Sequence, residues 1–507
     1  MSLSFNPVKL VLLIGWVYLC LFLVQRTEFN PRVPKERKGI ANLVTLITGP
    51  LLPLVLAIRD GMKKSSSQGG SFMAAVTENL RHAFSHIGPA LHVSKGDSKI
   101  SLLDSSGRGI REIYGHDKSK QEDRHVLVMT EKIILEAIEE RASDILIDPQ
   151  NDSTHTVRFR IDGMLHSVSQ VDSEMGQAVI NSIKAVSNMD ISERRRPQDG
   201  AFTAKIKDGT IAFRVASAGV ISGEKLSIRV LNQNARTLSL SNVGLAKKQQ
   251  KIIADFIAKP SGMLLMCGPT GSGKTTTVYA MLNEIDFYSR NVITVEDPIE
   301  CLLPNCSQIE VNPKADITFA KSLRSILRQD PDVICVGEIR DEETAGIALR
   351  ASQTGHLVLA TIHSDTNASA LVRLLDLGVS PLLLSSGLNL IISQRLIRRL
   401  CDNCKVPAKL SPSDITGFKK RGIEYRHMYQ AQGCRKCKNT GYYGRNGVFD
   451  ILVLDDKLKS SIAVNSLSIA TLKADGEKRG KSILYKAGLR LVVSGETDLE
   501  ELKRVVG

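Results

Sequence analysis

The sequence predicts an α/β protein organised around a parallel β-sheet that is covered by helices on both faces. A glycine-rich loop, 268–277, lies between an apolar run, 263–267, and a helix-compatible run, 275–285. Later apolar runs end in carboxylates or a histidine, and they alternate with helical segments. This alternation of strands and helices is typical of parallel sheets buried between two helical layers.

The loop has the pattern G-x-x-x-x-G-K-[ST], which binds nucleotide phosphates. Its backbone N–H groups would surround phosphate, Lys274 would reach the β- and γ-phosphates, and the Thr275 hydroxyl would ligate Mg²⁺. The following helix N-terminus would add favourable partial charge. A ligand-free glycine turn is the alternative, but it does not account for the lysine and threonine. The expected nucleotide-binding residues are Gly268, Pro269, Thr270, Gly271, Ser272, Gly273, Lys274, Thr275 and Thr276.

Length and composition indicate a folded protein of several domains. The chain has 507 residues, of which 42% are apolar and 24% charged, and domains average roughly 150 residues. The net charge of +14 favours acidic partners such as nucleotide, anionic lipid or nucleic acid, although a solvated basic surface would give the same value. Nine cysteines without a disulfide-like pattern suit a reducing compartment.

Residues 1–64 are expected to associate with a membrane. The run 10–24 carries no charge but is short for a spanning helix, which needs about 20 residues. A second uncharged run, 40–58, is long enough and is interrupted by Pro50 and Pro53. A secretory signal peptide fits poorly, because no basic segment precedes the first run and no clear cleavage site follows it.

Basic segments follow both apolar runs, and the positive-inside rule would keep both in the cytoplasm. A simple two-span hairpin would export the first segment, whereas a spanning first run with a re-entrant second run would keep both inside. Packed helices of a cytosolic domain are the third alternative. The polar residues 65–126 are expected to form a linker with at most a small ordered piece.

An α+β domain is predicted for 127–235, where a helical pattern is followed by strand-like runs. Its arginines are prominent. Arg214 and Arg229 lie on strand-like segments, where they could form a fork of donors toward phosphate in a neighbouring domain or subunit. Ordinary ion pairing on the faces of the sheet is the equal alternative.

The segment 236–400 contains the phosphate loop and three strand-end clusters. Glu296 and Glu300 follow the apolar run 292–295, and Glu338 follows the run that ends at Val336. Ligands gather at the carboxyl ends of parallel strands, where a carboxylate can hold Mg²⁺ through water or orient the attacking water. His363 ends a further strand and could touch the γ-phosphate. The segments 371–377 and 381–396 are expected to be helical.

Two C-x-x-C pairs lie in the segment 401–450, and residues 451–507 are expected to be helical. Two thiolate pairs suit a closed, tetrahedral, structural Zn²⁺ site, and the basic residues around them favour thiolates. Four free cysteines are the alternative. The expected ligands are Cys401, Cys404, Cys434 and Cys437.

The sequence resembles the secretion and pilus-assembly ATPases of type II secretion and type IV pilus systems over about 127–500. The resemblance rests on the segments 268–277, 295–300, 323–332, 336–341, 354–361, 394–401 and 433–442. It implies a RecA-like motor domain preceded by a PAS-like domain, a hexamer, and a location on the cytoplasmic face of the inner membrane. It also implies a polytopic inner-membrane platform protein as partner, with other secretion or pilus components.

The resemblance also implies roles for individual residues. Glu338 is implied as the catalytic carboxylate of an atypical Walker B motif that has Gly337 where many phosphate-loop enzymes have aspartate. Glu296 and Glu300 would belong to an acidic box and His363 to a histidine box. Arg214 and Arg229 would approach the γ-phosphate. The implied cofactors are ATP, Mg²⁺ and Zn²⁺.

Two departures from the family pattern stand out. Hydrophobic runs replace the usual soluble docking domain, so the chain could anchor itself. The histidine is followed by 364–367, Ser-Asp-Thr-Asn, where relatives usually have Thr-Asn-Asp. The sequence thus predicts a hexameric, Mg²⁺-dependent ATPase. The alternatives are a nucleotide-bound, non-hydrolysing membrane scaffold and a nucleic-acid translocase. Because aromatic content is only 5%, we expect no nucleic-acid partner.

Overall fold

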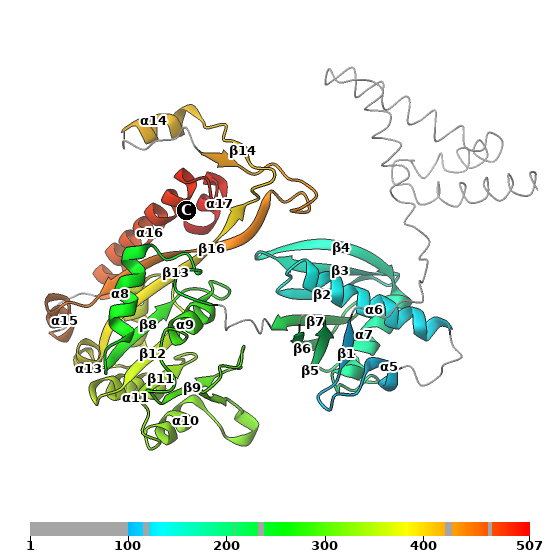
Figure 1. Cartoon of the computed structure of the whole chain (residues 1–507), viewed down its shortest axis with the longest axis horizontal. Coiled ribbons are helices and arrows are strands. Elements are labelled where there is room, and N and C mark those ends of the chain that lie inside the picture. Colours follow the sequence, from blue (N-terminus) through cyan, green and yellow to red (C-terminus); the bar gives the residue numbers. More distant parts are fainter. Residues whose placement is uncertain (1–99, 115–120, 208, 232–237, 421–427, 465–468) are drawn as a thin grey trace, which may run out of the picture. The chain divides into compact units, whose positions relative to one another are not determined.

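The computed structural model describes residues 100–114, 121–207, 209–231, 238–420, 428–464 and 469–507. Within these ranges no helix combines the length and the apolar character needed to cross a membrane. The predicted membrane-associating region, 1–64, lies outside the described residues. The described part folds as an N-terminal α+β domain followed by an α/β domain (Figure 1).

The N-terminal domain is built on a seven-stranded antiparallel sheet in the order β1-β5-β6-β7-β2-β3-β4. Its strands are β1 (Ser101–Leu103), β2 (Asp144–Asn151), β3 (Thr154–Ile161), β4 (Met164–Asp172), β5 (Gln198–Ile206), β6 (Gly209–Val220) and β7 (Gly223–Leu231). Its helices are α5 (Ile110–Ile113), α6 (Gln121–Glu139) and α7 (Ser173–Val186). The α+β class agrees with the sequence, and a closer likeness to a PAS domain stays a prediction.

Helix α7 shows why this domain folds as it does. The Asp172 side chain caps it by accepting a hydrogen bond of 2.7 Å from the Met175 N–H. Val179, Ile180 and Ile183 recur at helical spacing and are buried against the sheet. Strand β1 pairs with β5, and Ile110 of α5 joins the same core. The ordered domain therefore reaches back into the segment 65–126, which we expected to be a linker with at most a small ordered piece.

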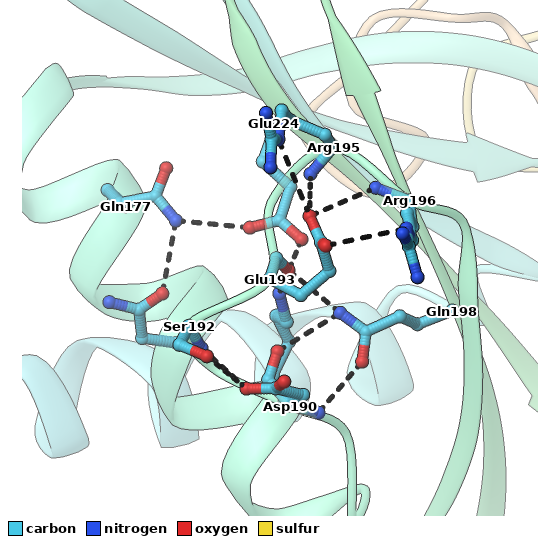
Figure 2. Close-up of polar contacts among 10 residues, drawn as sticks. Gln177, Asp190, Ser192, Glu193, Arg195, Arg196, Gln198 and Glu224 are labelled. Atoms are coloured by element: carbon cyan, nitrogen blue, oxygen red, sulfur yellow. Dashed lines mark hydrogen bonds and ion pairs between the residues drawn. The ribbon is translucent and has the colours of Figure 1, made fainter.

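A charged cluster lies inside this domain, between α7 and the loop that precedes β5 (Figure 2). The Lys184 ammonium and the Glu224 carboxylate are fully buried and 2.7 Å apart. Lys184 also donates to the backbone carbonyl of Glu193, and Gln177 donates to Glu224. The Glu193 carboxylate in turn accepts from the Arg195 N–H. The ion pair thus fixes the position of the loop as well as that of the helix.

The α/β domain contains a second seven-stranded sheet, in the order β10-β9-β11-β12-β8-β13-β16. Its strands are β8 (Gly262–Cys267), β9 (Val292–Glu296), β10 (Ser307–Glu310), β11 (Val333–Val336), β12 (Leu357–Ile362), β13 (Leu388–Leu400) and β16 (Tyr442–Val453). The helices around it are α8 (Lys247–Ile257), α9 (Lys274–Leu282), α10 (Phe319–Ile326), α11 (Glu342–Gln353), α12 (Asn367–Asp376) and α13 (Pro381–Gly387). The predicted α/β core is therefore confirmed.

Strand β8 illustrates the burial of both faces of this sheet. Met263 and Leu265 belong to one hydrophobic core, whereas Leu264 and Met266 belong to the other, and all four are inaccessible to solvent. Successive side chains of a strand point to opposite faces, so a continuous apolar run is needed where both faces are covered. This is the physical reason for the unbroken run that precedes the phosphate loop.

The predicted helix over 381–396 is wrong beyond Gly387. From Leu388 the chain forms β13, which pairs in parallel with β8 and antiparallel with β16. Ile391 enters one core and Ile392 the other, which is the two-residue period of a strand. The sheet is also mixed rather than wholly parallel, because β16, within the segment expected to be a cysteine element, adds an antiparallel strand.

The remaining elements surround the end of β13 and β16. A two-stranded sheet, β14 (Val406–Pro407) with β15 (Tyr429–Gln430), accompanies α14 (Pro412–Lys420). The C-terminal helices are α15 (Asp456–Ala463), α16 (Ile469–Val493) and α17 (Leu499–Val506). Leu484, Val492 and Leu502 of α16 and α17 pack against Ile397 of β13 in a separate small core.

We predict that Lys184→Ala destabilises the N-terminal domain by about 3–5 kcal/mol, because it leaves the buried Glu224 carboxylate without its counter-ion. Lys225→Ala, which removes a partly exposed lysine from Asp148, should cost only about 0–1 kcal/mol. Chemical unfolding followed by circular dichroism measures both. The double variant Lys184→Met with Glu224→Leu should recover most of the loss, and equal effects of the two lysine substitutions would contradict the argument.

Candidate active site

The phosphate loop connects β8 to α9 as the sequence predicts. Gly271 has φ +76°, and Gly273, the residue before α9, has φ +86°. A residue with a Cβ adopts this left-handed region only under strain. The N-terminus of α9 therefore opens directly onto the loop, where its unpaired N–H groups favour an anion.

Lys274, the first residue of α9, is turned back onto its own loop. Its ammonium donates to the carbonyl of Gly268 at 2.8 Å. Burial lowers the pKa of Lys274, while the nearby Glu338 carboxylate acts in the opposite direction. The Ser272 hydroxyl is buried in the same loop and has no hydrogen-bond partner among the described residues. An ammonium and an unpaired hydroxyl beside a glycine-rich loop fit a nucleotide phosphate.

Glu338 lies at the carboxyl end of β11, next to the phosphate loop. Its carboxylate is 3.0 Å from His363 Nε2 and accepts a hydrogen bond of 2.9 Å from Arg340 Nε. Only 20% of its side-chain surface is exposed. The structure therefore brings together Lys274, Glu338 and His363, which the sequence had placed at three different strand ends.

The glycine before Glu338 has a steric role. Gly337 donates to the carbonyl of Val295 at 2.7 Å. A Cβ on Gly337 would lie 3.0 Å from that same carbonyl oxygen and 3.1 Å from Glu296 Cα. The close approach of β11 to β9 thus accounts for a glycine at this position.

Arg340 was not singled out from the sequence. Besides Glu338 it contacts Asp297, with 3.0 Å between Nη1 and Oδ2. Arg340 therefore ties the end of β11 to the acidic loop after β9. The basic residue four places after Val336 is visible in the sequence, but nothing in its spacing shows that it would face Glu338 rather than solvent.

The two glutamates of the acidic box occupy different environments. Glu296 is buried within the sheet, whereas Glu300, on the loop that follows, keeps solvent-accessible surface although protein atoms surround much of its carboxylate. The resulting desolvation and the neighbouring Glu296 raise the pKa of Glu300, and Arg229, the Thr275 side chain and Arg214 oppose that rise. Thr275 is the expected Mg²⁺ ligand. Glu300 thus lies beside the start of α9, whereas the Glu296 side chain is buried.

Arg214 and Arg229 face each other on neighbouring strands β6 and β7. Arg214 pairs with Glu310 at 2.7 Å, and Arg229 lies 3.3 Å from Asp144. Two-thirds of the Arg229 side chain is exposed. The ion-pair alternative considered from the sequence therefore describes their direct contacts.

The four cysteines converge on one point. Their Sγ atoms all lie within 4.8 Å of one another, although the two pairs are 33 residues apart in sequence. Backbone N–H groups of Cys434 and Gly441 donate to Cys437 Sγ at 3.1 and 3.3 Å. Such donors stabilise a thiolate. The site therefore fits a tetrahedral Zn²⁺ held by Cys401, Cys404, Cys434 and Cys437.

The thiols of this cluster differ in environment. A hydrogen bond from the Asn403 side chain, with N–H donors of the backbone, lowers the pKa of Cys434 to about 6. Desolvation raises the pKa of Cys404 to about 12. Cys401 is almost fully buried next to them. A divalent cation would offset the cost of holding several thiolates in this partly buried position.

Comparisons with known proteins agree with this site. A family model described as "Type II/IV secretion system protein" matches residues 119–504. "Type II secretion system protein E" of Aeromonas hydrophila is 40% identical over 386 residues, which make up 76% of each chain. "Type IV pilus assembly ATPase PilB" of Myxococcus xanthus is 36% identical over 434 residues, covering 84% of this chain and 76% of that protein. The solved Legionella pneumophila ATPase DotB has a TM-score of 0.55 at 18% identity, over 74% of this chain and 95% of its own, and thus shows the fold alone.

The α/β core, with its phosphate loop and strand-end carboxylate, defines an ATPase of the phosphate-loop class. Within that class the chain belongs to the type II/IV secretion system protein family. The resemblance to secretion and pilus-assembly ATPases seen in the sequence is thereby confirmed.

We predict that metal analysis of the purified full-length protein finds one zinc per chain, bound by the four thiolates. Cys401→Ser should reduce the zinc content sharply and expose 401–437 to proteolysis, because the metal that joins the two C-x-x-C pairs is no longer held. Cys306→Ser, a cysteine outside the cluster, is the matched control and should retain the metal. Zinc-free protein with an equally resistant 401–437 segment would exclude the metal site.

Proposed function

We propose that this protein is a Mg²⁺-dependent ATPase that works as a hexameric motor in a type II secretion or type IV pilus-assembly machine. The observation that carries the proposal is the meeting of Lys274, Glu338 and His363 at the phosphate loop. Relatives named for secretion and pilus assembly cover most of the chain and support the same machine class. The hexamer and the polytopic inner-membrane platform partner are implied by family resemblance.

The chemistry is phosphoryl transfer from ATP to water, which depends on positioning and charge neutralisation more than on covalent catalysis. The residues 268–276 would hold the phosphates, and Lys274 would exchange the Gly268 carbonyl for a phosphate oxygen. Thr275 would ligate Mg²⁺, which supplies charge neutralisation when bound. Glu300, whose carboxylate lies beside the Thr275 side chain, would help to orient this hydroxyl.

Glu338 is the residue that would orient the attacking water. For that role the carboxylate must be able to turn toward the water, and in the structure Arg340 holds its Oε2 while His363 holds its Oε1. Nucleotide phosphates offer both side chains a competing anionic partner. We propose that Arg340 or His363 shifts toward phosphate when ATP binds, which frees Glu338. His363 would then report the presence of the γ-phosphate to β12.

Three features outside the phosphate loop also have a place in this proposal. The tetracysteine element would be a structural zinc site, because all four ligands come from the protein. The residues 1–64 would anchor the motor at the cytoplasmic face of the inner membrane. Arg214 and Arg229 would leave their present partners for the γ-phosphate in the assembled motor.

We predict that Glu338→Gln retains ATP binding and loses turnover by about 10²–10³-fold, since the amide cannot act as the carboxylate does toward water. The measurement is steady-state ATP hydrolysis beside equilibrium binding of a fluorescent ATP analogue. Glu284→Gln, a glutamate outside the strand-end clusters, is the control and should keep its activity. Parental turnover in Glu338→Gln would remove the assignment, and no turnover in the parent would favour the scaffold alternative.

We predict that Arg214→Ala and Arg229→Ala each lower kcat by about tenfold or more, because each removes one cation from the developing γ-phosphate charge. Arg195→Ala is the matched control, since its side chain is 94% exposed on a loop of the same domain. Initial rates across ATP concentrations separate kcat from KM. Equal rates in all three variants would leave the ion-pair role as the better account.

A further inference from the structure

The carboxylate of Glu296 lies at the centre of a buried hydrogen-bond network. The Tyr279 hydroxyl donates to its Oε2 at 2.5 Å. The Thr294 hydroxyl and the Gln308 amide both donate to its Oε1, at 2.7 and 3.0 Å. Glu296 is 4% exposed and Tyr279 3%. These donors come from α9, β9 and β10, so the network joins three elements of the motor domain.

The same side chains hold the acidic loop that follows β9. The Tyr279 oxygen accepts from the Cys301 N–H at 3.3 Å. The Gln308 amide donates to the Cys301 carbonyl at 3.0 Å and accepts from the Leu303 N–H at 2.7 Å. The backbone just after Glu300 is therefore fixed to the network from two sides.

The hydrogen-bond donors around Glu296 determine which further ligands its carboxylate can bind. A carboxylate offers about four acceptor positions, and three of them are filled by protein donors. The side chain is also shielded from solvent, so neither Mg²⁺ nor a water beside the nucleotide has access to it. Glu300, in contrast, keeps solvent-accessible surface, and its carboxylate lies beside the Thr275 side chain. The two glutamates that the sequence placed in one catalytic group therefore have separate tasks.

We propose that Tyr279 and Glu296 form a positioning pair that sets the distance between the acidic loop and α9, and so keeps Glu300 beside the first turn of α9. Neither residue of the pair touches the substrate. Tyr279 lies one helical turn after Thr275, and a helix moves as a rigid body over this distance. This inference rests on the proposed Mg²⁺-dependent ATPase activity.

The positioning pair has a kinetic signature that a purely structural pair lacks. If Glu300 loses its position, its carboxylate moves away from Thr275, the expected Mg²⁺ ligand. ATP binding through the phosphate loop does not depend on that contact. The pair should therefore affect kcat and the Mg²⁺ requirement, while leaving the affinity for Mg²⁺-free ATP unchanged.

The experiment uses full-length protein and compares Tyr279→Phe, Glu300→Gln and their double variant. Tyr279→Phe removes one hydroxyl and keeps the ring packing. A hydrogen bond to a charged group contributes about 1.5–3 kcal/mol, which corresponds to roughly 10–100-fold in rate. We expect a kcat loss of about tenfold or more and a higher Mg²⁺ concentration at half-maximal rate. The double variant should be no slower than Glu300→Gln alone, because both substitutions act through the Glu300 carboxylate.

Tyr288→Phe is the matched control, since Tyr288 is 88% exposed and should leave all rates unchanged. ATP affinity measured in EDTA should be equal in every variant, which shows that the fold and the loop are intact. Additive losses in the double variant, or an unchanged Mg²⁺ dependence in Tyr279→Phe, would overturn the positioning role. A parent without ATP hydrolysis would instead overturn the proposed function, so the two failures are distinguishable.

A further variant, Glu296→Gln, tests the role of Glu296 itself. A positioning role predicts that Glu296→Gln and Tyr279→Phe shift the Mg²⁺ requirement in the same direction and combine without adding. Complete loss of turnover in Glu296→Gln, with Tyr279→Phe at the parental rate, would show instead that Glu296 acts directly in the reaction.

Discussion

The parallel pairing of six strands is the constraint on which the site depends. In parallel strands the carboxyl ends meet at one edge of the sheet, so residues far apart in sequence become neighbours. The phosphate loop follows β8, Glu338 follows β11 and His363 follows β12, and these three strands lie within one sheet. Both faces are covered, so the strands must be apolar throughout and polar chemistry is restricted to their ends. The order of strands in the sheet thus determines which strand-end side chains lie close enough to act on one ligand.

Much of this edge could be predicted from the sequence, because its signals are local. The loop at 268–276 carries its own pattern, and a carboxylate directly after an apolar strand indicates a ligand site at that strand end. The contacts of Arg340 and Tyr279 could not be predicted, since they depend on which strand lies next to which. The helix predicted over 381–396 fails beyond Gly387 for a related reason. A run of leucine and isoleucine fits either element, and only pairing with β8 and β16 on both sides selects the strand β13.

The N-terminal domain shows a second limit of sequence reasoning. Its α+β class follows from alternating patterns, yet the buried pair of Lys184 and Glu224 is invisible in them, because both residue types are normally exposed. Arg214 and Arg229 of this domain pair with carboxylates in the structure. An arginine that pairs with a carboxylate in one arrangement can pair with a phosphate in another, and the guanidinium geometry suits both.

The tetracysteine cluster lies where β13 ends and β16 begins. Leu400 and Tyr442 are paired across these strands, and Cys401 and Cys437 flank them in the sequence. The chain between Cys404 and Cys434 therefore leaves and returns at a single closed point. The entropy of closing such an excursion grows only slowly with its length. A change in the length of this excursion would therefore cost little entropy, provided that Phe418 and Met428 within it keep their places in the small core with Ile397, α16 and α17.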